Sequence, residues 1–297
     1  MLDFQNVQLS DKNEIDKLLA LSDYNGCTYS FGSLYCWGGY YNTRFAIDGS
    51  CLYIIGGEGE KQSYMYPAGT FDLKTAINTL LEDAKERGIN FALSAVTSEQ
   101  KLLLEEAFPN KFEFTADRDF FDYIYNKSDL QELAGKKYHG KRNHISKFMR
   151  SYNWSYEEVT QSNLDKCRKV AQQWCIENDC KDSGALKVER CALARALDSF
   201  SELGFSGGLL SVEDEPVAFC LGEGLNSNTY ITHYEKALRS FNGAYTMINR
   251  EFAKNTVGAQ YEHINREEDT GDEGLRKAKL SYYPAVLLEK YYVTLRG

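Results

Sequence analysis

Residues 261–292 read Tyr-Glu-His-Ile-Asn-Arg-Glu-Glu-Asp-Thr-Gly-Asp-Glu-Gly-Leu-Arg-Lys-Ala-Lys-Leu-Ser-Tyr-Tyr-Pro-Ala-Val-Leu-Leu-Glu-Lys-Tyr-Tyr. The stretch begins with the period-two alternation of a strand, which Gly271 breaks. Thr270 and Glu273 have capping-box spacing, so we predict that a short helix starts there and ends before Pro284. Residues 285–293 are then typical of a closing strand.

Polar side chains of both signs gather where the first strand of this stretch leads into the helix. In open sheets, ligands often bind at the carboxyl ends of strands, so this end is a candidate binding site. Arginine clamps phosphate or carboxylate with two prongs, and lysine acts as a point charge. The alternative is a structural network in which Arg266 pairs with Glu267 or Asp269. The candidate residues are Asn265, Arg266, Glu267 and Asp269 near the strand end, and Arg276, Lys279 and Tyr282 on the helix.

Two motifs carry a resemblance to a known family. One is Asn265-Arg266-Glu267 with Asp269, Gly271, Gly274-Leu275-Arg276, Lys279, Ser281-Tyr282 and Pro284; the other is the run from Leu133 to Phe148. Together they resemble a bacterial family of unknown function that is grouped with the C-terminal catalytic domain of phosphatidylglycerol lysyltransferases. The resemblance implies an α/β (α+β) fold of two tandem GNAT-type acyltransferase domains, each a mixed central sheet flanked by helices. It constrains the fold more than the reaction.

The pattern of elements along the chain favours the same architecture. We expect a first GNAT-like domain over residues 1–127, a basic connecting segment over 128–152 and a second GNAT-like domain over 153–297. Asp48-Gly49 is the strongest hairpin signal in the chain. The other expected elements are helices at 73–87, 99–108, 164–178, 188–203 and 245–254, a strand at 89–96, a strand region at 111–125, a hairpin around 213–216 and a strand at 229–236.

Composition excludes several broad classes. With 297 residues, 43% hydrophobic and 26% charged, the chain has the balance of a globular protein of two domains. A net charge of −9 is unlike that of a bulk nucleic-acid binder. We find no signal peptide and no run near the roughly 20 apolar residues of a membrane helix, so a cytoplasmic location is expected. Eight cysteines without a Cys-x-x-Cys pair predict reduced thiols and no metal site.

Residues 136–150 hold six basic side chains and no acid in an otherwise acidic protein. Ile145, Phe148 and Met149 fall at helical spacing, so one face of this segment is expected to pack and the other to stay charged. Lys141 and Arg142 are candidates for an anion site that would hold a phosphate-bearing substrate. The alternative is a solvated linker helix.

The resemblance also places a donor-binding loop. In GNAT-type folds the loop after the fourth strand leads into a helix whose free amides bind a pyrophosphate. Here the loop supplies Arg239, Asn242, Gly243 and Ala244. It departs from the usual Arg/Gln-x-x-Gly-x-Gly/Ala signature at Asn242, which counts against acetyl-CoA. The donor is left open between an acyl-CoA and an aminoacyl-tRNA.

Acyl transfer needs a base for the acceptor, a group that stabilises the oxyanion and an acid for the leaving group. Glu235, at the end of the fourth strand, is the candidate base, and Tyr282 is the candidate acid. The leading hypothesis is an acyl or aminoacyl transferase acting on an amine or hydroxyl of a small molecule or lipid head group, with tRNA as a further partner. A non-catalytic module that binds a phosphorylated ligand is the alternative, and an acetyl-CoA-dependent N-acetyltransferase is the third.

Overall fold

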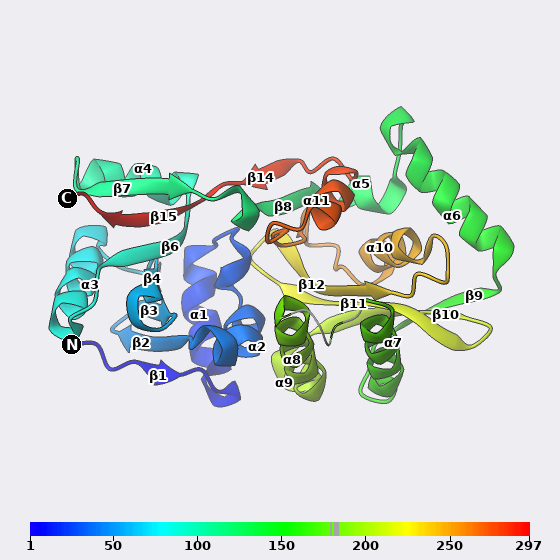
Figure 1. Cartoon of the computed structure of the whole chain (residues 1–297), viewed down its shortest axis with the longest axis horizontal. Helices are drawn as coiled ribbons and strands as arrows, with labels where there is room; N and C mark the ends of the chain where they lie inside the picture. Colours follow the sequence, from blue (N-terminus) through cyan, green and yellow to red (C-terminus); the bar gives the residue numbers. More distant parts are fainter. Residues whose placement is uncertain (179, 181–183) are drawn as a thin grey trace. The chain divides into compact units, whose positions relative to one another are not determined.

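The computed structural model describes residues 1–178, 180 and 184–297, which form two compact units. The first comprises residues 1–123, 267–279 and 286–297, and the second comprises residues 124–266 and 280–285. Each unit combines a mixed sheet with flanking helices (Figure 1). This is the predicted α/β (α+β) class.

The first unit is built on a sheet with the strand order β1-β2-β3-β4-β6-β15-β7, in which β5 also pairs with β3. The β4–β6 pair is parallel and the other pairs that define the register are antiparallel. The elements are β1 (Gln5–Asn6), α1 (Lys12–Ser22), α2 (Phe31–Tyr41), β2 (Arg44–Asp48), β3 (Cys51–Gly56), β4 (Ser63–Met65), β5 (Ala68–Gly69), α3 (Leu73–Arg87), β6 (Ala92–Thr97), α4 (Ser98–Ala107), β7 (Phe112–Ala116), β14 (Val286–Leu288), β15 (Lys290–Leu295) and, up to Lys279, α11 (Glu273–Leu280).

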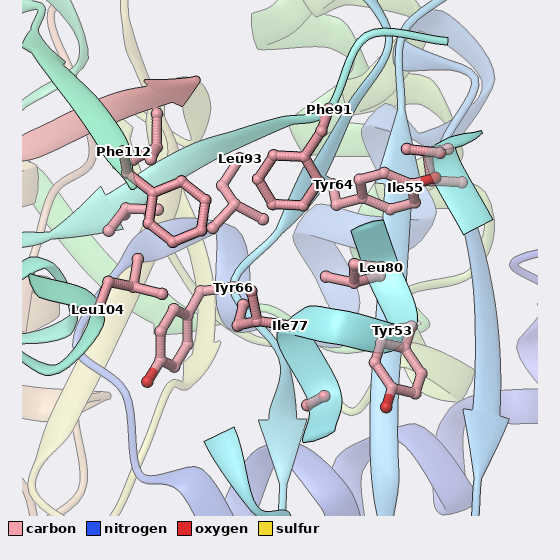
Figure 2. Packing of buried hydrophobic residues seen from close by; sticks show 14 of the residues in the cluster. Tyr53, Ile55, Tyr64, Tyr66, Ile77, Leu80, Phe91, Leu93, Leu104 and Phe112 are labelled. Carbon is pink, nitrogen blue, oxygen red and sulfur yellow. The ribbon is translucent and has the colours of Figure 1, made fainter. Parts of the chain in front are cut away.

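An aromatic-rich core holds this unit together. Ile77 and Leu80 lie on the buried face of α3, whose N-terminus is capped by the Asp72 side chain. Figure 2 shows them packed with Tyr64, Phe91 and other side chains of the sheet. Val293 of the C-terminal strand β15 is fully buried in the same core. The last strand of the chain therefore completes the first sheet.

The second unit is built on strands that run in the order β8-β13-β12-β11-β10-β9. β12 and β13 are parallel, and the other pairs are antiparallel. Helix α10 packs on β10–β12 and α7 on β11 and β12, and Figure 1 shows them on opposite faces of the sheet. The elements are β8 (Asp122–Asn126), α5 (Lys127–Glu132), α6 (His139–Ser151), β9 (Trp154–Glu158), α7 (Leu164–Glu177), α8 (Gly184–Asp198), α9 (Phe200–Leu203), β10 (Ser206–Val212), β11 (Glu215–Gly224), β12 (Thr229–Ala237), α10 (Ala244–Asn255) and β13 (His263–Asn265).

The units interleave along the chain, whereas the sequence analysis expects contiguous domains. Residues 267–279 and 286–297 belong to the first unit, and the basic segment 128–152 lies within the second. The physical reason lies in strand pairing: β15 pairs with both β6 and β7, while β8 leaves the first unit to pair with β13. The expected strand region 111–125 is accordingly two strands in two sheets.

Both predicted hairpins form. Gly49 has φ +60° in the turn between β2 and β3, and Glu213 and Asp214 both have positive φ between β10 and β11. The cap prediction for α11 is wrong, because the side chain of Asp272, and not that of Thr270, accepts the Leu275 amide at 2.6 Å. Asp272 competes better because it lies immediately before the first helical residue.

Over the residues that the structure describes, every helix is too short or too polar to cross a bilayer.

Candidate functional site

Glu235 and Arg266 meet in the second unit where β12 and β13 part. The parallel pairing ends at Ile231 and Asn265, whereas β12 continues to Ala237. Arg266 therefore follows the end of β13 directly, and its Nη2 donates to both carboxylate oxygens of Glu235 at 3.0 and 3.1 Å. Both side chains are close to nine-tenths buried. The pair that forms is Arg266–Glu235, and not the expected Arg266–Glu267 or Arg266–Asp269.

Two further groups fix the Glu235 carboxylate. Asn249 of α10 donates through Nδ2 to Glu235 Oε2 at 2.9 Å. Cys220 is the direct cross-strand neighbour of Glu235 on β11. Burial and the adjacent Glu235 raise the pKa of the Cys220 thiol well above its ordinary value, so it stays protonated. For Arg266, burial lowers the pKa but Glu235 outweighs it, so the guanidinium stays charged.

Tyr282 lies against this ion pair. Its ring centroid is 5.0 Å from Arg266 Cζ and 6.5 Å from the Tyr125 ring. Burial raises the pKa of the Tyr282 hydroxyl to about 12, and Glu235 adds to the shift while Arg266 and the Thr246 hydroxyl oppose it. A phenol with this pKa is a proton donor at neutral pH.

Lys141 of α6 also contacts the Tyr282 ring. Its Nζ is 3.7 Å from the ring centroid, which is a close cation–π contact. The same Nζ donates to Ser281 Oγ at 2.7 Å. We call Glu235, Arg266, Tyr282, Lys141 and Asn249 the β12–β13 cluster.

Two amides of the predicted donor loop already have partners within the protein. Gly243 precedes α10 with φ +95°, and a Cβ there would lie 2.9 Å from the His144 carbonyl oxygen of α6. The Ala244 amide donates to the Phe241 carbonyl, and the Arg239 amide donates to Glu177. Asn242 is exposed. Helix α6 thus packs closely against Gly243 at the N-terminus of α10.

Arg276 and Lys279 have structural partners in the first unit. Arg276 donates to both oxygens of Asp269 at 2.7 and 2.9 Å and to Asp119. Lys279, although buried, donates to the backbone carbonyls of Glu267 and Glu268. These contacts favour the structural alternative for this half of the predicted site.

Asp269 is the centre of that network. Its carboxylate is fully buried and also accepts from Arg118, the Tyr123 hydroxyl and the Gly271 amide. Burial alone would raise the pKa of Asp269, but the bonds from Arg276 and Tyr123 outweigh it and hold that pKa well below its ordinary value.

The remaining candidates support the backbone. Asn265 is fully buried at the end of β13. Glu267 has φ +58°, and its carbonyl accepts from the Tyr123 amide at 3.2 Å. Arg142 donates to the carbonyls of Leu133 and Gly135, which ties α6 to the turn before it.

A buried ammonium that the sequence analysis missed lies in the first unit. Lys290 of β15 is 2.6 Å from Asp122, 2.9 Å from Glu268 and 3.3 Å from Cys27 Sγ. These three side chains could by type ligate a metal, but the Lys290 ammonium is already bonded to all three. Burial lowers the pKa of Lys290, but Asp122 and Glu268 more than offset it.

One member of the β12–β13 cluster and two residues that contact it are not evident from the sequence. Asn249 is a polar residue beside Ile248 on a helix predicted only for its apolar face. Tyr125 looks like any aromatic strand residue in sequence, and Ser281 is one small polar residue within a longer motif. Of these three residues, only Asn249 gave a usable signal in the sequence, because it is a polar residue next to the apolar face of a helix.

The comparisons with known proteins agree with this architecture. Residues 19–294 match the family described as phosphatidylglycerol lysyltransferase, C-terminal. A conserved protein of unknown function from Bacteroides thetaiotaomicron is 42% identical with a TM-score of 0.96, and 100% of each chain is covered. An uncharacterised protein of Mycoplasmoides gallisepticum is 26% identical over 180 residues, 58% of this chain and 55% of that protein. The match thus spans about half the length of that relative.

More distant solved structures share the fold. L-PGS from Bacillus licheniformis is 16% identical with a TM-score of 0.65, covering 96% of this chain and 91% of that one. A tandem GNAT protein from the clavulanic acid biosynthesis pathway is 8% identical with a TM-score of 0.50, covering 100% and 99%. The predicted tandem GNAT-type fold is confirmed, and the chain belongs to the phosphatidylglycerol lysyltransferase C-terminal family.

Proposed function

We propose that this protein is an acyl or aminoacyl transferase and that the β12–β13 cluster of the second unit carries the reaction. The observation that supports this best is the meeting of a buried, protonated phenol with an oriented carboxylate and a guanidinium in one place. A proton acceptor, a proton donor and a fixed positive charge are what transfer to an amine or hydroxyl requires.

Each group has a proposed role. Glu235 accepts the proton of the attacking amine or hydroxyl, and Tyr282 returns a proton to the leaving oxygen. Arg266, which stays charged beside them, offsets the negative charge of the tetrahedral intermediate. Asn249 orients the Glu235 carboxylate through its 2.9 Å hydrogen bond.

The donor we propose is an aminoacyl-tRNA, with a small molecule or lipid head group as acceptor. The close approach of α6 to Gly243 supports a donor other than acetyl-CoA, because the His144 carbonyl lies against the glycine that leads into α10. The basic helix α6, which continues with Lys147 and Arg150 on its exposed side, is a suitable approach for a phosphate-bearing donor.

A non-catalytic binding module is the second candidate. The observation that favours it is the completeness of the Glu235–Arg266 pair, because a carboxylate bonded to a guanidinium and an amide is a weaker base than a free one. Such a module would still bind an anionic ligand through the cations around Tyr282.

A transfer assay separates the two candidates. The full chain is incubated with tRNA charged with labelled amino acids and with a panel of amines and phosphatidylglycerol vesicles, and transferred label is counted. We expect Glu235→Gln to slow transfer by about 10²–10⁴-fold, and Tyr282→Phe to slow it as well. Glu215→Gln is the matched control, since Glu215 forms an exposed pair with Lys169. If a ligand raises the thermal stability of the protein but no donor, acyl-CoA included, supports transfer, the binding module is favoured.

A further inference from the structure

The contact between Lys141 and Ser281 stands apart from the other contacts that basic side chains of residues 136–150 make. The neighbouring Arg142 donates to backbone carbonyls. Lys137, just before the helix, pairs loosely with Asp129 at 3.8 Å and lies over the Tyr138 and Tyr283 rings. Lys141 Nζ instead lies 2.7 Å from a side-chain hydroxyl, that of Ser281. Both residues are part of the second unit, and both keep some exposure to solvent.

The surroundings of Lys141 favour a neutral amine more than those of a surface lysine do. Among the described residues Lys141 makes no ion pair, and the charged groups that face it are Arg266 and Glu235. Burial lowers the pKa of Lys141 to about 8, and Arg266 lowers it further while Glu235 opposes the shift. The Tyr282 ring, 3.7 Å from Nζ, would stabilise an ammonium that forms there.

We propose that Ser281 and Lys141 form a Ser–Lys dyad, in which Ser281 is a nucleophile that carries the acyl group as an ester and Lys141 is its base. This arrangement is one of the known variants of the activated serine. The proposal deepens the proposed function and rests on it for the biological donor, since it divides the transfer into two steps at the same cluster.

The two steps balance without any redox partner. Neutral Lys141 takes the hydroxyl proton as Ser281 Oγ bonds to the acyl carbon of an ester donor, and the ester C–O bond then breaks. The departing alkoxide takes the proton from the Lys141 ammonium and leaves as an alcohol. In the second step an acceptor amine or hydroxyl attacks the acyl carbon and its proton passes to Glu235. The Ser281 ester bond then breaks as Tyr282 gives a proton to Ser281 Oγ, and the proton on Glu235 replaces the one that Tyr282 gave. Ser281 Oγ regains a proton, so the dyad returns to its first state.

An activated ester tests the first step alone. The full chain is mixed with p-nitrophenyl acetate, release of p-nitrophenol is followed, and the acyl-protein is measured by intact mass and peptide mapping. We expect a burst of one acetyl group per chain, located on Ser281. The acylation rate should rise with pH through about 8, as Lys141 loses its proton.

Variants with matched controls decide the roles of the two residues. Ser281→Ala should lose the burst, while Ser146→Ala, on the exposed side of α6, should keep it. Lys141→Met should slow acylation by about 10²–10⁴-fold, while Lys169→Met, at an exposed lysine of α7 outside the β12–β13 cluster, should not. Lys141→Arg keeps a cation beside Tyr282 but cannot deprotonate, so it should fold normally and acylate as slowly as Lys141→Met. Thermal unfolding of each variant shows that it is folded.

The outcomes separate the dyad from the transferase proposal. If the wild-type protein gains no mass at Ser281, or Ser281→Ala acylates as fast, the dyad is overturned. If this happens while Glu235→Gln still slows transfer from charged tRNA, transfer is direct and the proposed function stands. If Ser281 is acylated but no donor supports transfer, the dyad stands and the proposed function falls. Equal acylation by Lys141→Arg and wild type would overturn the role of Lys141 as base.

Discussion

Asp269 and Glu235 show how two carboxylates near one motif come to different roles. Asp269 is fully buried and accepts from two arginines, a tyrosine and a backbone amide, so every direction around it is filled. Glu235 accepts from one arginine and one asparagine and lies beside the Tyr282 ring. The first arrangement holds a structure together, and the second leaves the Glu235 carboxylate with fewer hydrogen-bond donors. The sequence places both carboxylates near strand ends but does not reveal their partners.

The Asp269 network should be a main source of stability in the first unit. Asp269→Asn removes the charge that Arg118 and Arg276 neutralise, and breaking a buried pair costs about 3–5 kcal/mol. Urea unfolding at pH 7 measures this loss. Asp165→Asn, at a fully exposed carboxylate, is the control and should change stability by less than about 0.5 kcal/mol. A loss below 1 kcal/mol for Asp269→Asn would show that the network is not structural.

The contribution of Asp269 to the free energy of unfolding should depend on pH. The pKa of Asp269 is lower in the folded protein than the ordinary value of about 3.9, so its stabilisation is fully present above that value. It is lost as the pH falls through the folded pKa. The difference in unfolding free energy between wild type and Asp269→Asn should therefore shrink below about pH 4 and stay constant between pH 6 and 8.

At the scale of elements, the packing of helix α6 against the N-terminus of α10 depends on Gly243. Gly243 has φ +95°, which costs an L-residue about 1–2 kcal/mol, and a Cβ would also press on the His144 carbonyl of α6 at 2.9 Å. We expect Gly243→Ala to lower the unfolding free energy by at least about 1 kcal/mol. Gly140→Ala in α6 is the control: it meets no atom within 4 Å and should be neutral or slightly stabilising. Equal thermal unfolding of the two variants would contradict this account.

The elements themselves were largely predictable, because hairpin and helix signals are local. The turns at Gly49 and Glu213 and the helix stop at Gly88 follow from backbone geometry that few residues tolerate. Helix α2 was missed, since its aromatic and glycine-rich sequence has poor helix propensity and forms because Phe31, Leu34 and Cys36 become buried. The site was only half predictable: Glu235, Arg266 and Tyr282 do meet, but Arg276 and Lys279 bond within the first unit.

At the scale of the whole molecule, the chain order hides which unit the C-terminal strand belongs to. Local periodicity predicts a strand after Pro284 but carries no information about its partner strand, because pairing is a long-range property. The fully buried Val293 and the pairing of β15 with β6 and β7 settle that it completes the first sheet. Chain order alone predicts this strand in the second domain, because sequence carries no such information about its partners.

Hydrogen exchange can test this membership without cutting the chain. Amides of β15 should exchange by the same opening reaction as those of β6, because a strand paired on both sides is exposed only when its sheet opens. Leu80→Ala removes a fully buried side chain of the first core and should cost about 2–5 kcal/mol there, so it should speed exchange in residues 290–295. Leu209→Ala, equally buried in the second sheet, is the matched control and should speed exchange in β10 and β11 while leaving β15 unchanged. Contiguous domains would give the reverse pattern, with β15 responding to Leu209→Ala and not to Leu80→Ala.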